Sequence, residues 1–155
     1  MKSFLSIILL LLVYVGHAQG VDVPVGKTEY KELQTFEWYE LGYENYRPKK
    51  RVVNDLGNDL NQFQVLIFGG TWCPDTQKLL PHFYKVLHDA GYPLDDVSLY
   101  LLDFDKSSPE GEEENYAIKY IPTLVLMKDG EEVGRIVERV KKSVEVDLRE
   151  IIRDK

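Results

Sequence analysis

The chain has 155 residues, of which 44% are hydrophobic, and this is enough material for one domain with a core of its own. Its formal net charge of −7 at pH 7 argues against nucleic acid, and against an anionic membrane surface, as the main partner. Because it has a single cysteine, it cannot close a disulfide within itself.

Residues 1–18 have the pattern of a secretory signal peptide. Lys2 supplies a positive charge, and the apolar run over residues 4–15 is too short for a comfortable bilayer span. Gly16 and Ala18 then place small residues at a cleavage site. We predict cleavage after Ala18, no stable membrane insertion afterwards, and export to the periplasm or the extracellular space. The alternative is an uncleaved membrane anchor formed by the same run.

An N-terminal helical extension is predicted over residues 19–49, ahead of a domain that covers residues 50–155. An irregular or extended lead-in over residues 21–30 is followed by a mostly helical pattern up to about residue 60. The helical stretch is rich in large apolar side chains: Leu33, Phe36, Trp38, Tyr39, Tyr43 and Tyr46. We interpret these as core and packing surface, and the competing interpretation is a groove for a peptide partner.

The rest of the chain alternates strands and helices and includes a hairpin near its end. Asp129-Gly130 marks the hairpin turn, and Ser143 is the expected N-cap of the last helix. The predicted elements are strand 64–70, helix 74–90, strand 97–104, helix 113–119, strand 123–127, strand 132–138 and helix 144–152. This order implies an α/β fold, a three-layer sandwich with a central mixed β-sheet flanked by helices.

The only cysteine lies at a strand-to-helix turn, in the run Trp72-Cys73-Pro74-Asp75-Thr76. Proline suits the first position of a helix, so Pro74 is expected to begin one. The free backbone N–H groups and the dipole at a helix start favour the thiolate form of Cys73. A second cysteine three residues later would complete a Cys-x-x-Cys motif, but that position holds Thr76.

No metal site and no cofactor are predicted. His17 falls in the signal region, and His82 and His88 are six residues apart, which does not place them on one face of a helix.

These motifs resemble the thioredoxin family over roughly residues 50–153. Four features carry the resemblance, in the expected order: the run around Cys73 where the family has Trp-Cys-x-x-Cys, Pro81 where it has a helix-kinking proline, Tyr120-Ile121-Pro122-Thr123 where it has its cis-proline, and the turn Lys128-Asp129-Gly130-Glu131. Two departures stand out, because Thr76 replaces the second cysteine and Ile67 stands where thioredoxins carry a buried acid. Both departures resemble Cys-x-x-Ser and Cys-x-x-Thr members, which act as single-thiol enzymes or as binding modules.

The resemblance implies roles for six residues. Cys73 and Thr76 are the predicted catalytic pair, with the Thr76 hydroxyl donating a hydrogen bond to the thiolate. The predicted substrate-binding residues are Trp72, Pro74, Ile121 and Pro122. Pro122 would lie opposite Cys73 after a cis bond, and the backbone of Ile121 would pair with an extended substrate peptide. The implied partners are a disulfide-containing protein or a small thiol, together with an external thiol reductant.

The predicted function is single-thiol disulfide exchange through Cys73, by a thiol–disulfide oxidoreductase or isomerase that lacks a resolving cysteine. A thiol of the substrate would complete isomerisation, and an external thiol would complete reduction. The alternative is a non-catalytic thioredoxin-like binding or chaperone module that uses the aromatic N-terminal segment. A thiol peroxidase is a third class, but no set of residues that would polarise a peroxide is evident.

Overall fold

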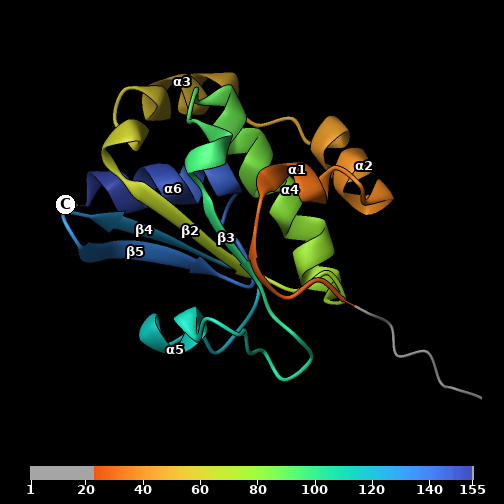
Figure 1. Ribbon diagram of the computed structural model, residues 1–155. Helices are drawn as coiled ribbons and strands as arrows, with labels where there is room; N and C mark the ends of the chain where they lie inside the picture. The colour runs from red at the N-terminus through yellow and green to blue at the C-terminus, as the bar shows by residue number, and fades with distance from the viewer. Residues whose placement is uncertain (1–22, 155) are drawn as a thin grey trace, which may run out of the picture.

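A mixed five-stranded sheet forms the centre of the molecule (Figure 1). The computed structural model describes residues 23–154, so the predicted signal peptide lies outside the described residues. The strand order is β1-β3-β2-β4-β5. The strands are β1 (Gly26–Thr28), β2 (Gln64–Gly69), β3 (Ser98–Leu101), β4 (Thr123–Lys128) and β5 (Glu131–Val137). Strands β2 and β3 are parallel, and the other neighbouring pairs are antiparallel.

Helices cover both faces of the sheet. They are α1 (Tyr30–Leu33), α2 (Glu37–Asn45), α3 (Lys50–Gly57), α4 (Pro74–Asp89), α5 (Glu112–Asn115) and α6 (Val144–Arg153), with short 3₁₀ turns at Leu60–Gln62 and Leu94–Asp96. Figure 1 shows α5 on the opposite side of the sheet from α3, α4 and α6. The predicted three-layer sandwich is therefore confirmed. Within residues 23–154, no helix is both long enough and apolar enough to cross a membrane.

The central strands are apolar on both faces because both faces are buried. In β2, Val65 and Ile67 belong to the large core beneath the main helices, whereas Leu66 and Phe68 belong to a smaller core on the α5 side. Strands β3 and β4 alternate in the same way, as side chains of a strand must. This explains why the strands lack the polar–apolar alternation of a half-exposed sheet.

The parallel pair of β2 and β3 brings the ends of the two strands together at the edge of the sheet where the cysteine lies. Helix α4 makes the crossover from β2 to β3, which pair from Leu66 with Ser98 to Gly69 with Leu101. One residue further, the Leu102 N–H donates to the Gly69 carbonyl at 2.7 Å. The loop that carries the cysteine therefore leaves the sheet beside the loop that follows β3.

The segment before residue 50 contributes directly to this core. Residues 26–28, expected only as an extended lead-in, form strand β1 and pair with β3. The Tyr39 ring lies edge-on to Tyr84 of α4, with centroids 6.0 Å apart, and Tyr30 stacks on the same ring at 5.0 Å. The apolar side chains of the segment pack on the core, as in our first interpretation of them.

Two elements differ from their predicted extents, and one cap differs in its chemistry. The second predicted strand, 97–104, is shorter as β3, and the predicted helix 113–119 is a single turn as α5. Ser143 occupies the N-cap position of α6, but its hydroxyl donates to the Glu145 carboxylate at 2.8 Å instead of capping a backbone N–H.

The contact between α2 and α4 gives a testable prediction. A Cβ atom at Gly42 would lie 2.8 Å from Pro81 Cγ, which is closer than real Cβ atoms approach a neighbour. Replacing Gly42 by alanine should therefore force α2 away from α4 and lower the free energy of unfolding by about 1–3 kcal/mol in urea denaturation. Glu40→Ala, at an exposed position of the same helix, should change it by less than about 0.5 kcal/mol. An equal effect of the two substitutions would contradict this packing.

Candidate active site

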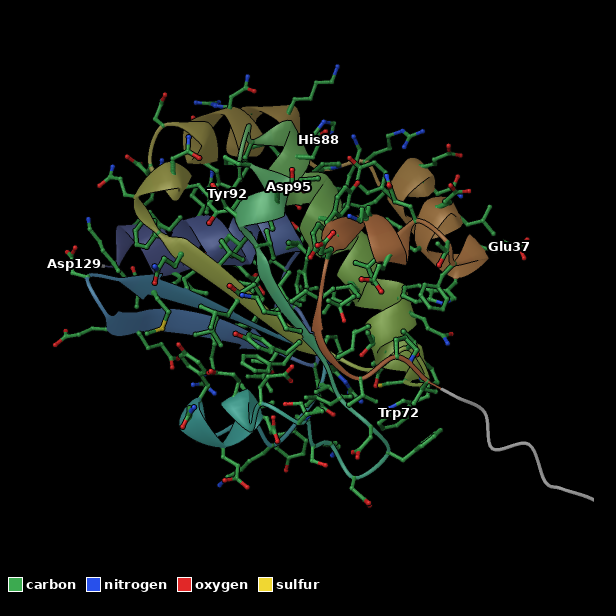
Figure 2. All side chains as sticks on the ribbon, viewed as in Figure 1. Glu37, Trp72, His88, Tyr92, Asp95 and Asp129 are labelled. Atoms are coloured by element: carbon green, nitrogen blue, oxygen red, sulfur yellow. The ribbon has the colours of Figure 1, made fainter. Side chains whose placement is uncertain are left out.

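Cys73 lies where β2 ends and α4 begins. It has an extended backbone (φ −85°, ψ 120°) and occupies the N-cap position, with Pro74 as the first residue of the helix. Its N–H donates to the Gly70 carbonyl, and its own carbonyl accepts from the Gln77 N–H, both at 2.9 Å. Figure 2 shows the neighbouring Trp72 at one end of α4 and His88 at the other. The thiol is thus held at the positive end of a 16-residue helix.

The sulfur faces the backbone just before Pro122. Cys73 Sγ donates to the Ile121 carbonyl at 3.8 Å, and the Ile121–Pro122 peptide bond is cis. Cys73 is 8% exposed and belongs to the smaller core on the α5 side. Ile121 is 3% exposed, so the predicted substrate-binding backbone is close to the sulfur and largely covered by neighbouring side chains.

Thr76 has a different partner from the one expected. Its side chain is fully buried, and its Oγ1 accepts a hydrogen bond from the Gly70 N–H at 3.3 Å. In the described part of the chain, no hydrogen bond joins this hydroxyl to Cys73 Sγ. The reason is that Gly70 is buried, and a buried backbone N–H requires an acceptor. In this structure Thr76 therefore positions the loop that carries the cysteine.

Gln77 and Trp72 hold the same loop. The Gln77 side-chain amide donates to the Thr71 carbonyl at 2.7 Å, and Trp72 Nε1 donates to the Leu102 carbonyl at 3.0 Å. A Cβ atom at Gly70 would lie 2.7 Å from Trp72 Nε1, so only glycine fits beneath this indole. Gln77 was not expected to act at the site, because in the sequence it is an ordinary polar residue of a helix.

Two exposed aromatic side chains lie near the site and were also not predicted. Phe104, in the loop after β3, is 61% exposed, and its ring centroid is 5.0 Å from that of Trp72. Tyr120, next to Ile121, is 52% exposed. The only available signal for Phe104 was its place between Asp103 and Asp105, at the end of the predicted strand 97–104. Exposed apolar side chains that gather in one region indicate a contact surface.

Three further residues that the sequence singled out are Pro74, Asp75 and Ile67. Pro74 and Asp75 are exposed on the first turn of α4, and the Asp75 side chain is turned to solvent. Ile67 is fully buried in β2, so an apolar side chain fills the position where thioredoxins, which the sequence resembles, carry a buried acid. Within residues 23–154, no cluster of three or more histidine, cysteine, aspartate or glutamate side chains is arranged to hold a metal ion.

The two structured histidines serve packing. His82 stacks on Tyr46 with centroids 4.0 Å apart, and burial together with the nearby Lys78 ammonium lowers its pKa. His88 Nδ1 is 2.6 Å from the Tyr43 hydroxyl.

Together the fold and the site define a thiol protein whose cysteine begins a helix beside a cis-proline loop. The sequence model of the thioredoxin family matches residues 50–152, and the chain belongs to this family. Membership supports thiol–disulfide redox chemistry in general.

Individual relatives agree with this assignment. The chain is 42% identical over 74 residues to a thioredoxin of Chlamydia trachomatis, covering 47% of this chain and 67% of that protein. It is 30% identical over 91 residues to the mitochondrial thioredoxin-3 of Saccharomyces cerevisiae, covering 59% and 67%. The chain spans 63% to 67% of the length of the curated relatives it matches. A crystal structure of a Pseudomonas aeruginosa protein of unknown function shares the fold, with a TM-score of 0.54 at 14% identity over 83% of this chain and 89% of that chain.

Proposed function

We propose that the protein performs single-thiol disulfide exchange through Cys73. The observation that carries the proposal is the pairing of one cysteine, at the start of α4, with Thr76 in place of a second thiol. The thiolate is the attacking form of a cysteine, and Cys73 occupies the N-cap position of α4. The loop is held by the hydrogen bonds of Thr76, Gln77 and Trp72, so the nucleophile is presented in a fixed position.

The exchange takes place in two displacements. The Cys73 thiolate attacks one sulfur of the substrate disulfide, forms a mixed disulfide with it, and expels the other sulfur as a thiolate. A second thiolate then attacks the substrate sulfur of the mixed disulfide, and Cys73 leaves as the thiolate. If the attacker belongs to the substrate, the substrate disulfide is rearranged. If it is an external thiol, the substrate is left bonded to that thiol, and a further equivalent of external thiol completes the reduction.

The partners follow from this chemistry. The first is a protein or small molecule that carries a disulfide, held near Trp72, Pro74 and the Ile121–Pro122 backbone. The second is an external thiol reductant. We further propose that the protein acts after export, in the periplasm or outside the cell, because residues 1–18 have the pattern of a signal peptide.

The test is the reaction of the purified protein with glutathione disulfide and with an aromatic disulfide at pH 7. Cys73 should react about tenfold or more faster than an ordinary cysteine, of which only a few per cent is ionised at that pH. Mass spectrometry should show one added glutathione, which persists until an external thiol is supplied. Cys73→Ser should show no adduct. A rate equal to that of free cysteine, or an adduct that resolves without added thiol, would refute the proposal.

The binding-module alternative depended on exposure of the aromatic N-terminal segment. Tyr39 is buried, and Phe36, Trp38, Tyr43 and Tyr46 are partly buried against the main core. These side chains stabilise α4 from outside and leave little exposed aromatic surface for a partner, although the 8% exposure of Cys73 is what the alternative would require.

A further inference from the structure

Exposed large apolar side chains gather at the end of the sheet that carries the cysteine. The structure describes five of them, at Val25, Leu41, Phe104, Tyr120 and Val137. Phe104 lies in the loop after β3, and Tyr120 precedes Ile121. Val137 is paired with Thr123, the residue that follows the cis-proline. Three of the five therefore belong to the surface that a substrate meets as it approaches the sulfur.

Phe104 is displayed on a turn that its neighbours hold in place. The Asp103 carboxylate accepts from the Asp105 N–H and the Ser107 N–H, both at 2.9 Å, and from the Ser107 hydroxyl at 3.0 Å. The Lys106 N–H donates to the Asp103 carbonyl at 3.0 Å. These bonds fix the backbone on both sides of Phe104, so little of its freedom remains to be lost when a partner binds.

Tyr120 is held on a second turn, and one lysine joins the two turns. The Tyr120 carbonyl accepts from the Thr123 hydroxyl at 2.7 Å. Lys106 Nζ donates to the Lys119 carbonyl at 3.2 Å and lies 5.6 Å from the centre of the Tyr120 ring. The turn that carries Phe104 is therefore tied to the turn that carries Tyr120.

The two exposed rings are each connected to one partner of the contact at the thiol. Cys73 Sγ donates to the Ile121 carbonyl at 3.8 Å. The Phe104 ring packs on Trp72, which precedes Cys73, with centroids 5.0 Å apart, and Tyr120 precedes Ile121. Figure 2 shows Trp72 beside the loop that joins β3 to α5. A substrate that presents a sulfur to Cys73 therefore lies next to both rings.

This surface distinguishes between kinds of disulfide. Aromatic rings pack well against other rings and large apolar side chains, and they are enriched where proteins bind other polypeptides. Glutathione disulfide has no large apolar side chain, so it gains little from the two rings. A polypeptide with an aromatic or large aliphatic residue beside its disulfide cysteine can bury that side chain against them.

We propose that Phe104 and Tyr120 form a subsite for an aromatic or large aliphatic side chain next to the disulfide cysteine of an extended polypeptide. The proposal rests on the proposed function of Cys73 and names its substrate class, which is polypeptide disulfides with apolar flanking residues. The two rings determine specificity, and Lys106 is a positioning residue that keeps them in register.

The test compares three reagents in which a thiol is joined through a disulfide to the same coloured leaving group, nitrothiobenzoate. The thiols are a short peptide with phenylalanine on both sides of its cysteine, the same peptide with alanine at these places, and glutathione. Cys73 attacks the sulfur of the peptide or of glutathione, and nitrothiobenzoate leaves as the thiolate. The phenylalanine peptide should react about tenfold faster than the alanine peptide.

The double variant Phe104→Ala/Tyr120→Ala should remove this preference. Its rate with the phenylalanine peptide should fall about tenfold, and its rates with the other two reagents should stay within about twofold of the wild type. Lys106→Ala should lower the preference about threefold, and Lys106→Arg should restore it. Leu41→Ala, which removes an exposed apolar side chain from α2, is the matched control and should leave all three rates within about twofold.

The ratio of the two peptide rates separates this proposal from the proposed function. Slow but selective reaction would refute single-thiol exchange as the function and leave the subsite standing. Fast reaction without selectivity, or an equal loss with all three reagents in the double variant, would overturn the subsite. Sedimentation covers the case of a second copy as the occupant, because a dimer that the double variant abolishes, together with equal peptide rates, would also overturn it.

Discussion

Thr76→Cys is expected to convert the single-thiol protein into a dithiol protein with a reversible internal disulfide. Position 76 is three residues after Cys73, in the first turn of α4. Cα atoms three residues apart on a helix are about 5 Å apart, which is within the range of Cα–Cα distances that a disulfide bridges. The new thiolate should attack the mixed disulfide at Cys73 from within the same molecule. Because intramolecular attack has a high effective concentration, release should be at least about a hundredfold faster than with millimolar external thiol.

The measurement is the lifetime of the glutathione adduct after excess glutathione disulfide is removed. Thr76→Ser is the control, since it keeps a hydroxyl that can accept from Gly70 and adds no thiol. The adduct of Thr76→Ser should persist like that of the wild type. If the adduct of Thr76→Cys were equally long-lived, a thiol at position 76 could not reach the sulfur of Cys73, and the replacement of a second cysteine by Thr76 would not be what makes the wild-type adduct persist.

The second large effect is expected at Glu145, in the first turn of α6. Its carboxylate is 1% exposed and accepts from the Tyr46 hydroxyl at 2.8 Å, the Ser143 hydroxyl at 2.8 Å and the Lys49 N–H at 3.3 Å. Glu145→Ala would leave these donors without their acceptor, so the free energy of unfolding should fall by about 2–4 kcal/mol. Urea denaturation at pH 7 measures it. Glu150→Ala, which removes a half-exposed ion pair from the same helix, should cost less than about 1 kcal/mol.

The stabilisation by Glu145 should also depend on pH. Burial by itself would raise the pKa of Glu145, but the hydrogen bonds from Ser143, Tyr46 and the Lys49 backbone lower it below the ordinary 4.5. A group with a lowered pKa in the folded state stabilises fully above its unfolded pKa, and this stabilisation is lost as the pH falls through the folded value. The difference in stability between the wild type and Glu145→Ala should therefore shrink from about pH 5 to about pH 3. A difference that stayed constant over this range would show that the carboxylate charge contributes nothing.

The motif around Cys73 could be predicted from the sequence because its parts are close together along the chain. A buried strand, a proline at the first helical position and Thr76 at the spacing of a second cysteine all lie within about a dozen residues. The β2, α4 and β4 elements were likewise predicted close to their observed bounds, since β2 and β4 are continuous apolar runs and α4 begins at a proline and ends before Gly91.

Features that depend on contacts with residues far away in the sequence could not be predicted from it. Strand β1 is only three residues long and exists because Gly26–Thr28 pair with β3. Ser143 carried the pattern of an N-cap, but a carboxylate two residues later offers its hydroxyl a charged acceptor. The partner of Glu145 across the fold, Tyr46, is 99 residues away in sequence. The Thr76 hydroxyl bonds to Gly70 because the folded loop buries that N–H, and no local pattern indicates this burial.

The pairing of β1 also constrains the order in which the protein can assemble. Gly26 lies opposite Leu101, so the earliest strand in the chain acquires its neighbour only after most of the polypeptide has been synthesised. Closing so long a loop costs entropy before the strand contacts form, and contacts between distant residues slow folding. The parallel unit of β2, α4 and β3 closes over shorter separations. The cysteine turn is therefore expected to form first, and the N-terminal segment to be added to a structure that already holds the reactive sulfur.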